Sequence, residues 1–278
     1  MSWSPGQQAT RGRTVRPHPE SSTRVAASDL ARGRYCIGDG SFSFAAAHHL
    51  ANPPATENKA GRPHGHTFTV EVELTDTELR APGFVADYAE LAPVGEYLKR
   101  ELDHRDLNAL FTFDTTTDAL AQHITAWFLA HMPPERGKQL RAVRVGLGAA
   151  TGAHRHVDDE PFAFEAAHHL EGLPEGHKCG RPHGHSYRVD LRLDQQTSPR
   201  RRARLRSRLA EYLDRYLDHR DLNAVLELQP TSELLAEHLC AWTLSQADAR
   251  EAAAVQAVRV WESPRRWAEF AQDERSGQ

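Results

Sequence analysis

The sequence predicts an α+β fold that is built twice along the chain. Strand-like alternation, helical apolar stripes and an internal repeat point to this class. The repeated pairs are FSFAAAHHL at 42–50 with FAFEAAHHL at 162–170, GRPHGHTFTVEVEL at 61–74 with GRPHGHSYRVDLRL at 180–193, and LDHRDLNAL at 102–110 with LDHRDLNAV at 217–225. Two tandem copies of one domain explain these matches. Each copy reads as strand, loop, strand, helices and a final strand, which makes an α+β domain.

The ends of the two copies are predicted from composition and from the repeat. Residues 1–33 are rich in Arg, Ser and Pro and show no sustained apolar period, so we expect a disordered tail. An organellar transit peptide is the alternative, although prolines interrupt any long amphipathic helix there. Copy one is placed at 34–150 and copy two at 155–270.

The overall composition is typical of a globular protein of the cytoplasm. The chain is 39% hydrophobic and 26% charged, and its net charge of -4 gives no reason to expect nucleic-acid binding. Three cysteines do not suggest a disulfide framework, which fits a reducing compartment. There is no apolar run of about 18 residues that could span a bilayer and no secretory signal near the start. We therefore expect neither a nucleic acid nor a membrane as partner.

The strands of copy two are predicted from alternation, because successive side chains in a strand point to opposite faces. The apolar face of 162–168 ends in His168. The apolar face of 183–193 begins with His183 and His185. In each strand, histidine therefore continues the row of apolar side chains on the same face.

Two helices and a closing strand follow in copy two. Ser198 and Pro199 suit the N-cap and first position of a helix, and an apolar stripe at helical spacing follows them. A second helix is predicted to begin near Thr231 and to continue through Trp242. The closing segment AVRVWES alternates again and carries Glu262.

The histidines of the two strands form a candidate metal site. His168, His183 and His185 would supply three imidazoles, which is the catalytic zinc arrangement that leaves a fourth position open. The alternative is a set of hydrogen-bonded core histidines. Copy one repeats the pattern and offers a candidate second metal site, formed by His48, His64 and His66.

Cys179 lies four residues before His183, close enough to face the open position. It is either the fourth ligand of a structural zinc site or a reactive group. Because Lys178 and Arg181 flank it, we expect a lowered pKa and a thiol that can accept a proton. Copy one keeps its histidines but has Ala60 at the matching position. The cysteine is therefore better interpreted as reactive than as a zinc ligand.

The two copies differ in complementary ways. Copy one has Leu147 where copy two has Glu262, so its site is degenerate. Copy two lacks an equivalent of GFVADYAEL, at 83–91 in copy one, and has an arginine-rich segment instead. We therefore expect part of the sheet or the helix entry of copy two to be shortened.

Taken together, the motifs resemble the 6-pyruvoyltetrahydropterin synthase superfamily. Copy two resembles its bacterial branch, the 6-carboxytetrahydropterin synthases, through F-x-F-x-A-A-H, E-G-H-K-C-G-R-x-H-G-H, L-D-H-x-x-L-N, P-T-S-E and a Glu in the last strand. The resemblance covers nearly all of 162–262. It implies two tandem T-fold domains, each an antiparallel sheet with two helices on one face. It also implies self-association into a barrel with sites between domains, because a closed barrel needs more copies than one chain contains. A shortened sheet or helix entry in copy two would alter the geometry of this barrel.

The resemblance also implies catalytic roles. Cys179 would be the catalytic base or acid, with Asp218 and His219 as its relay partners. Because family sites form between subunits, copy one would supply a neighbouring wall, and the relay would alternatively come from Asp103 and His104. The plain interpretation of each Asp-His pair is a polar helix end.

Substrate binding and the reaction follow from the same resemblance. Glu262 would anchor a pterin ring, helped by Thr231 and Ser232, and Zn2+ would be the cofactor. The implied enzyme is a zinc-dependent carbon-carbon lyase that converts 7,8-dihydroneopterin triphosphate to 6-carboxytetrahydropterin, acetaldehyde and triphosphate, in 7-deazapurine (queuosine-type) biosynthesis. The alternatives are 6-pyruvoyltetrahydropterin synthase activity, which eliminates triphosphate, and a non-catalytic zinc- or pterin-binding pseudoenzyme.

Overall fold

The computed structural model describes residues 33–53, 59–148 and 160–273, and these residues form one nine-stranded sheet. The strand order is β4-β2-β1-β9-β8-β6-β5-β7, with the short β3 paired to β1. The predicted tail at 1–33 lies outside the described residues except for Gly33, where β1 begins. The predicted domain boundaries stay predictions.

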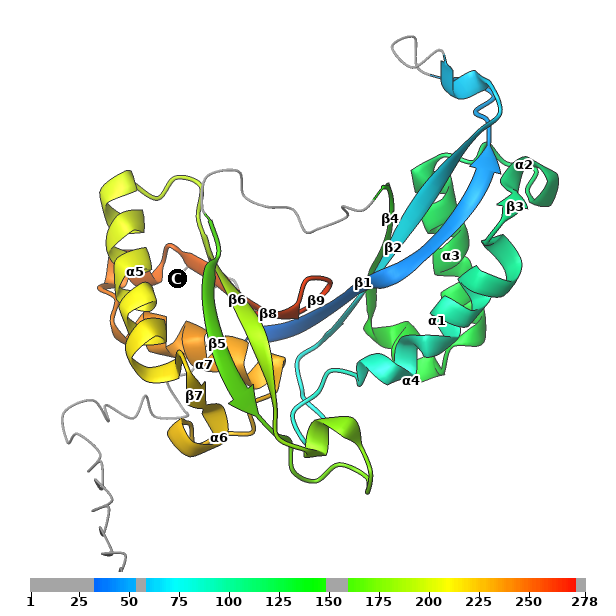
Figure 1. Cartoon of the computed structure of the whole chain (residues 1–278). Coiled ribbons are helices and arrows are strands. Elements are labelled where there is room, and N and C mark those ends of the chain that lie inside the picture. Colours follow the sequence, from blue (N-terminus) through cyan, green and yellow to red (C-terminus); the bar gives the residue numbers. More distant parts are fainter. Residues whose placement is uncertain (1–32, 54–58, 149–159, 274–278) are drawn as a thin grey trace, which may run out of the picture. The chain divides into compact units, whose positions relative to one another are not determined.

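Copy two contains the complete predicted order of elements (Figure 1). Its long elements are β5 (Phe162–His168), β6 (His183–Leu193), α5 (Pro199–Tyr212), α7 (Ser232–Ser245), β8 (Val255–Ser263) and β9 (Arg266–Gln272). Its short elements are η4 (Lys178–Gly180), η5 (Leu213–Leu217), β7 (Arg220–Asp221), α6 (Leu222–Val225) and α8 (Ala249–Ala252).

Copy one repeats this order over its described part. Its strands are β1 (Gly33–His48), β2 (His64–Asp76), β3 (Arg105–Asp106) and β4 (Leu140–Leu147). Its helical elements are η2 (Tyr88–Leu91), α1 (Ala92–Tyr97), η3 (Leu98–Leu102), α2 (Leu107–Leu110), α3 (Thr117–His131) and α4 (Pro134–Gln139). In each copy the helices cover one face of the strands (Figure 1), as expected for a T-fold.

The alternating pattern explains which strand residues enter the core. In β5, Phe164, Ala166 and His168 are buried, whereas the residues between them are exposed. The helices begin close to where the sequence places them: α5 has Pro199 at its first position, and the Thr231 hydroxyl caps α7 by accepting from the backbone N–H of Leu234. The expected Ser198 cap is absent, because its side chain makes no capping hydrogen bond.

The two copies are joined edge to edge. Gly33–Asp39 of β1 pairs antiparallel with Arg266–Gln272 of β9, so the sheet continues from one copy into the other. At this junction Trp267 is fully buried, and its indole N–H donates to Glu71 Oε1 at 2.7 Å. Arg266 Nε donates to Asp39 Oδ2 at 3.1 Å, and that carboxylate is also fully buried.

The far ends of the sheet remain open. Among the described strands, β4 and β7 occupy the two ends of the order and do not pair with each other. One chain therefore does not close a barrel, which agrees with the expectation that further copies complete it. No helix in the described ranges has the length and apolar character needed to cross a bilayer.

We predict that Gly38→Ala destabilises the junction. A Cβ on Gly38 would overlap the buried indole of Trp267, and that ring is fixed by its bond to Glu71. Overpacking of this kind costs about 1–3 kcal/mol. Urea-induced unfolding measures the loss. Gly40→Ala in the same strand is the control, because its Cβ would lie 3.6 Å from the nearest atom, the carbonyl oxygen of Arg265. Equal stabilities of the two variants would contradict the prediction.

Candidate metal centre

The three histidines of copy two are brought together by the pairing of β5 with β6. His168 lies opposite His183, and His185 lies opposite Ala166 on the same face. The centroid of the His168 ring lies 4.5 Å from that of His183 and 5.2 Å from that of His185. Ligand atoms of all three rings lie within 4.8 Å of one another.

The outer nitrogens of these rings determine what the inner nitrogens can do. The Nδ1 atom of His168 donates to the carbonyl of Pro230 at 2.8 Å, and Nδ1 of His183 donates to the carbonyl of Arg181 at 2.7 Å. A neutral ring that carries its proton on Nδ1 presents a bare lone pair at Nε2. The two Nε2 atoms lie only 3.1 Å apart. Two lone pairs at that distance repel each other unless a cation lies between them.

A proton is poorly suited to fill that place. Burial, helped by the neighbouring His183, lowers the pKa of His168 to about 4. Near neutral pH the ring is therefore uncharged. Backbone carbonyls that fix the Nδ1 protons are typical of metal-ligating histidines. The donor set and its geometry therefore fit a divalent metal such as Zn2+, with room for further ligands.

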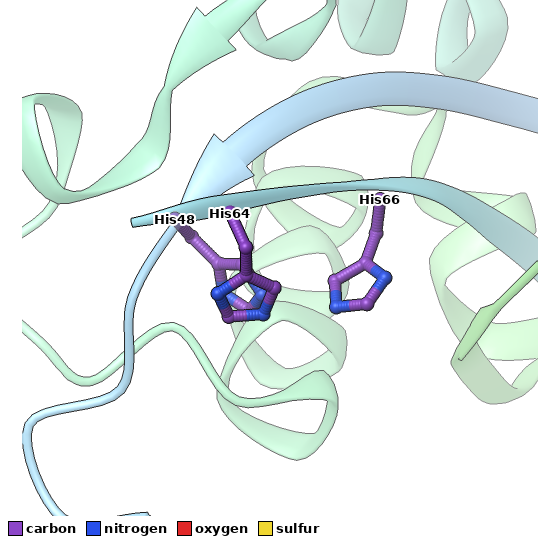
Figure 2. A group of neighbouring side chains, drawn as sticks. All are labelled: His48, His64 and His66. Atoms are coloured by element: carbon purple, nitrogen blue, oxygen red, sulfur yellow. The ribbon is translucent and has the colours of Figure 1, made fainter. Parts of the chain in front are cut away.

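Copy one builds the same arrangement from β1 and β2 (Figure 2). His48 Nδ1 contacts the carbonyl of Thr115 at 3.1 Å, and His64 Nδ1 donates to the carbonyl of Arg62 at 2.6 Å. The third ring, His66, lies 5.3 Å from the His48 ring, measured between centroids. The Nε2 atom of His48 is buried and has no hydrogen-bond partner among the described residues. This orphaned acceptor fits a metal ligand as well.

Cys179 lies in the turn of η4 and is partly buried. Its backbone N–H donates to Nδ1 of His177 at 3.2 Å, and its carbonyl accepts from the backbone of Leu170 at 2.8 Å. The expected lowering of its pKa is wrong for the protein without metal. Burial raises the pKa of the thiol, the charge of Glu262 raises it further, and Lys178 offsets this only in part. A bound cation would act in the opposite direction.

The expected anchor residues lie beside this cysteine. Ser232 Oγ donates to Glu262 Oε2 at 2.8 Å, which fixes one oxygen of the carboxylate. Glu262 also acts electrostatically on both Cys179 and His185. Glu262 is therefore close enough to both the thiol and the histidine triad of copy two to influence their charge states. Thr231 is almost fully buried at the start of α7, where its hydroxyl caps the helix.

The segment 83–91 of copy one lies against this site of copy two. The contacts are Thr231 Oγ1 to the carbonyl of Gly83 at 3.0 Å, the N–H of Val85 to Glu233 Oε1 at 3.1 Å, and His177 Nε2 to Asp87 Oδ2 at 3.2 Å. Next to them, Tyr88 donates through its hydroxyl to the carbonyl of Trp267 at 2.9 Å. The segment that copy two lacks is thus present at its site, supplied by copy one.

Glu233 is a site residue that sequence reasoning missed. Its side chain is buried, and burial raises its pKa to about 8, helped by the nearby charges of Glu262 and Asp87. The carboxyl is therefore largely protonated at neutral pH and can donate as well as accept. The signal available in the sequence was its place in P-T-S-E directly after Thr231 and Ser232.

The two Asp-His pairs have equivalent conformations in the two copies. Asp218 Oδ1 accepts from the N–H of Glu165 at 2.8 Å, and Oδ2 lies 2.8 Å from His219 Nδ1. In copy one, Asp103 accepts from Ala45 at 2.7 Å and lies 2.9 Å from His104. Both histidines have positive φ, and their side chains are about four-fifths exposed: 78% for His219 and 82% for His104. Within the described ranges, neither pair makes a hydrogen bond or ion pair with Cys179.

One protein-family model matches both copies. The model of the family described as 6-pyruvoyl tetrahydropterin synthase matches residues 39–148 and again residues 159–273. Together these segments cover well over half of the chain and correspond to the two repeats.

Two named proteins are similar to part of this chain. The chain is 36% identical over 70 residues to the dihydroneopterin monophosphate aldolase of Pyrococcus furiosus, a match that covers 25% of this chain and 59% of that protein. It is 31% identical over 105 residues to a protein of Archaeoglobus fulgidus with the provisional name 6-carboxy-5,6,7,8-tetrahydropterin synthase, covering 38% of this chain and 82% of the relative.

Solved structures were matched as well. The 6-pyruvoyl tetrahydropterin synthase of Caenorhabditis elegans aligns at 22% identity with a TM-score of 0.32, over 42% of this chain and 95% of that structure. An uncharacterised protein of Wolinella succinogenes aligns at 18% identity with a TM-score of 0.25, over 86% of this chain and 99% of that structure.

Proposed function

Because the chain belongs to the 6-pyruvoyl tetrahydropterin synthase family, we propose that it is a zinc-dependent lyase of the 6-carboxytetrahydropterin synthase type. Its substrate would be 7,8-dihydroneopterin triphosphate, converted with water to 6-carboxytetrahydropterin, acetaldehyde and triphosphate. The carboxypterin would serve 7-deazapurine (queuosine-type) synthesis. The observation that carries the proposal is the meeting of His168, His183 and His185 with Cys179 and Glu262 at one site.

The residues of copy two divide the work of such a reaction. The three imidazoles would hold Zn2+, which when bound polarises substrate hydroxyls and makes a neighbouring C–H easier to remove. The thiol of Cys179 would take or return that proton. Glu262, with one oxygen fixed by Ser232, would accept from the guanidine-like edge of the pterin. The buried carboxyl of Glu233, whose pKa is raised to about 8, would be largely protonated and would not repel Glu262.

Copy one supports this site and does not duplicate it. It has Ala60 in place of the cysteine, and its Leu147 is 49% exposed where copy two carries the anchor. In return, its segment 83–91 forms a wall of the copy-two site. One chain would therefore contain one site with the histidine triad, the thiol and the anchor, and one bare metal site.

Product analysis tests the proposed reaction. Purified zinc-replete protein is incubated with 7,8-dihydroneopterin triphosphate, and pterins and aldehydes are identified by mass. We expect 6-carboxytetrahydropterin with acetaldehyde, and loss of both in Cys179→Ala. A pyruvoylpterin would assign the chain to triphosphate elimination. A hydroxymethylpterin with a two-carbon aldehyde that still carries the triphosphate would indicate the aldol cleavage named for the Pyrococcus relative, and unchanged substrate would indicate a pseudoenzyme.

The matched histidines of the two copies separate metal binding from turnover. We predict two zinc ions per folded chain, falling to one in His48→Asn and to one in His168→Asn. Asparagine keeps a donor near the Nδ1 position but removes the inward ligand. Turnover should survive the first change and fall at least about tenfold in the second. Metal analysis by mass spectrometry, with the product assay, measures both. A loss of turnover in His48→Asn equal to that in His168→Asn would contradict the division of labour.

We assign the proton relay to another chain of the assembly. Both Asp-His pairs are surface features, and neither reaches Cys179 within the described chain. An open sheet that needs further copies provides the second chain. Either Asp103 with His104 or Asp218 with His219 would then enter the site from outside.

Complementation between inactive variants tests this assignment. Cys179→Ala retains both relay pairs, and the double variant His104→Ala/His219→Ala retains the thiol. We predict that each is inactive alone and that co-expressed mixed assemblies regain a measurable fraction of wild-type turnover. The single variants His104→Ala and His219→Ala then identify the pair that is used. Mixed assemblies that remain inactive would place the relay within one chain.

A further inference from the structure

We propose that Asp87 of copy one and His177 of copy two form a positioning clamp for Cys179. Asp87 fixes the His177 ring, and the ring fixes the turn that presents the thiol to the metal centre. The functional value of this clamp rests on the proposed function, because it matters for turnover only if Cys179 is the reactive group. Neither residue is assigned a chemical step.

The hydrogen bonds of His177 define one protonation state of its ring. The Nδ1 atom accepts the backbone N–H of Cys179 at 3.2 Å, so it carries no proton. The proton of the neutral ring is then on Nε2, which lies 3.2 Å from Asp87 Oδ2. A carboxylate at this position favours that tautomer, since it accepts from Nε2–H. The contact of Asp87 with Nε2 thus keeps Nδ1 of His177 free of a proton, so that it can accept the backbone N–H of Cys179.

Asp87 is itself held rigidly for this contact. Its Oδ1 accepts from the N–H of Ala89 at 2.8 Å, and its own N–H donates to Glu90 Oε1 at 3.1 Å, which together make a capping box. The other oxygen, Oδ2, therefore points at a defined place. The side chains of Asp87 and His177 are only 30% and 22% exposed, so water screens their interaction less than that of a surface pair.

A comparison of matching positions in the two copies indicates that His177 does more than cap a turn. At the position of His177, copy one has Asn58, which lies outside the described residues; asparagine is among the preferred capping residues. Copy one also lacks the cysteine, and copy two lacks the segment that contains Asp87. The chain therefore keeps the His, the Cys and the Asp only in the one combination in which they meet. Histidine differs from asparagine here because its Nε2 atom reaches Asp87.

Two substitutions remove the clamp and leave each local cap in place. His177→Asn reproduces the residue of copy one and keeps an acceptor for the N–H of Cys179, but it does not reach Asp87. Asp87→Ser keeps an N-cap acceptor for Ala89, but it is too short to reach His177. A double variant completes a cycle that measures the coupling between the two positions.

Hydrogen–deuterium exchange of the Cys179 turn is the first measurement, in zinc-replete protein. We expect Asp87→Ser to speed exchange in the peptide that contains residues 177–181, although the substitution lies in the other copy. Steady-state turnover is the second. Each single variant should lower kcat about tenfold through misplacement of the thiol, with little change in KM or zinc content, and the double variant should fall no further.

Tyr88→Phe is the matched control, because it removes a neighbouring cross-copy hydrogen bond, to the carbonyl of Trp267, that does not involve the cysteine turn. Its exchange in that turn should equal the wild-type rate. Unchanged exchange in both single variants, or additive losses of kcat in the double variant, would overturn the clamp. If wild-type protein shows no lyase activity, the proposed function fails, while the exchange data still decide whether Asp87 holds the turn.

Discussion

The antiparallel pairing of β1 with β9 is the constraint on which the rest of the site depends. It joins the last strand of copy two to the first strand of copy one and buries Trp267 between them. With the two copies fixed in this register, the segment after β2 reaches the site of copy two. The contacts of Gly83, Val85 and Asp87 are then consequences of the strand pairing. Two neighbouring domains that both contribute residues to this candidate site are thereby held in one polypeptide.

The candidate metal centre depends only on the pairing of two neighbouring strands and on nearby loop carbonyls. Alternation along paired strands places three imidazoles on one face, and backbone carbonyls fix the outer nitrogens of two of them. The inner nitrogens of His168 and His183 face each other as bare lone pairs. This part needs only a strand pair and a few loop carbonyls, and copy one therefore keeps it after losing the thiol and the anchor. The candidate metal ligands and the proposed acid–base groups therefore depend on different elements of the fold.

The sequence predicts what depends on local periodicity. The strands β5, β6 and β8 and the start of α7 lie where alternation and capping residues predict them, and the histidines of each copy lie together as expected. The strand β9 follows the predicted closing strand and was not predicted. The pKa of Cys179 was predicted in the wrong direction because flanking charges are visible in the sequence, whereas burial and the approach of Glu262 are not. Glu233 was missed for a similar reason. Its site character comes from burial and from a hydrogen bond to Val85, 148 residues away in the chain.

Complementary losses in the two copies explain why both are kept. A domain that supplies only a wall does not need Cys179 or Glu262, and copy one has alanine and leucine there. A domain that receives its wall from a neighbour does not need its own wall segment, and copy two passes from β6 into α5 through a short connection. In separate identical domains neither loss would be tolerated, because every domain would have to be both donor and acceptor. Fusion removes that requirement. Each copy can then lose the half of the site that its partner supplies, and the contact between Asp87 and His177 couples the halves that remain.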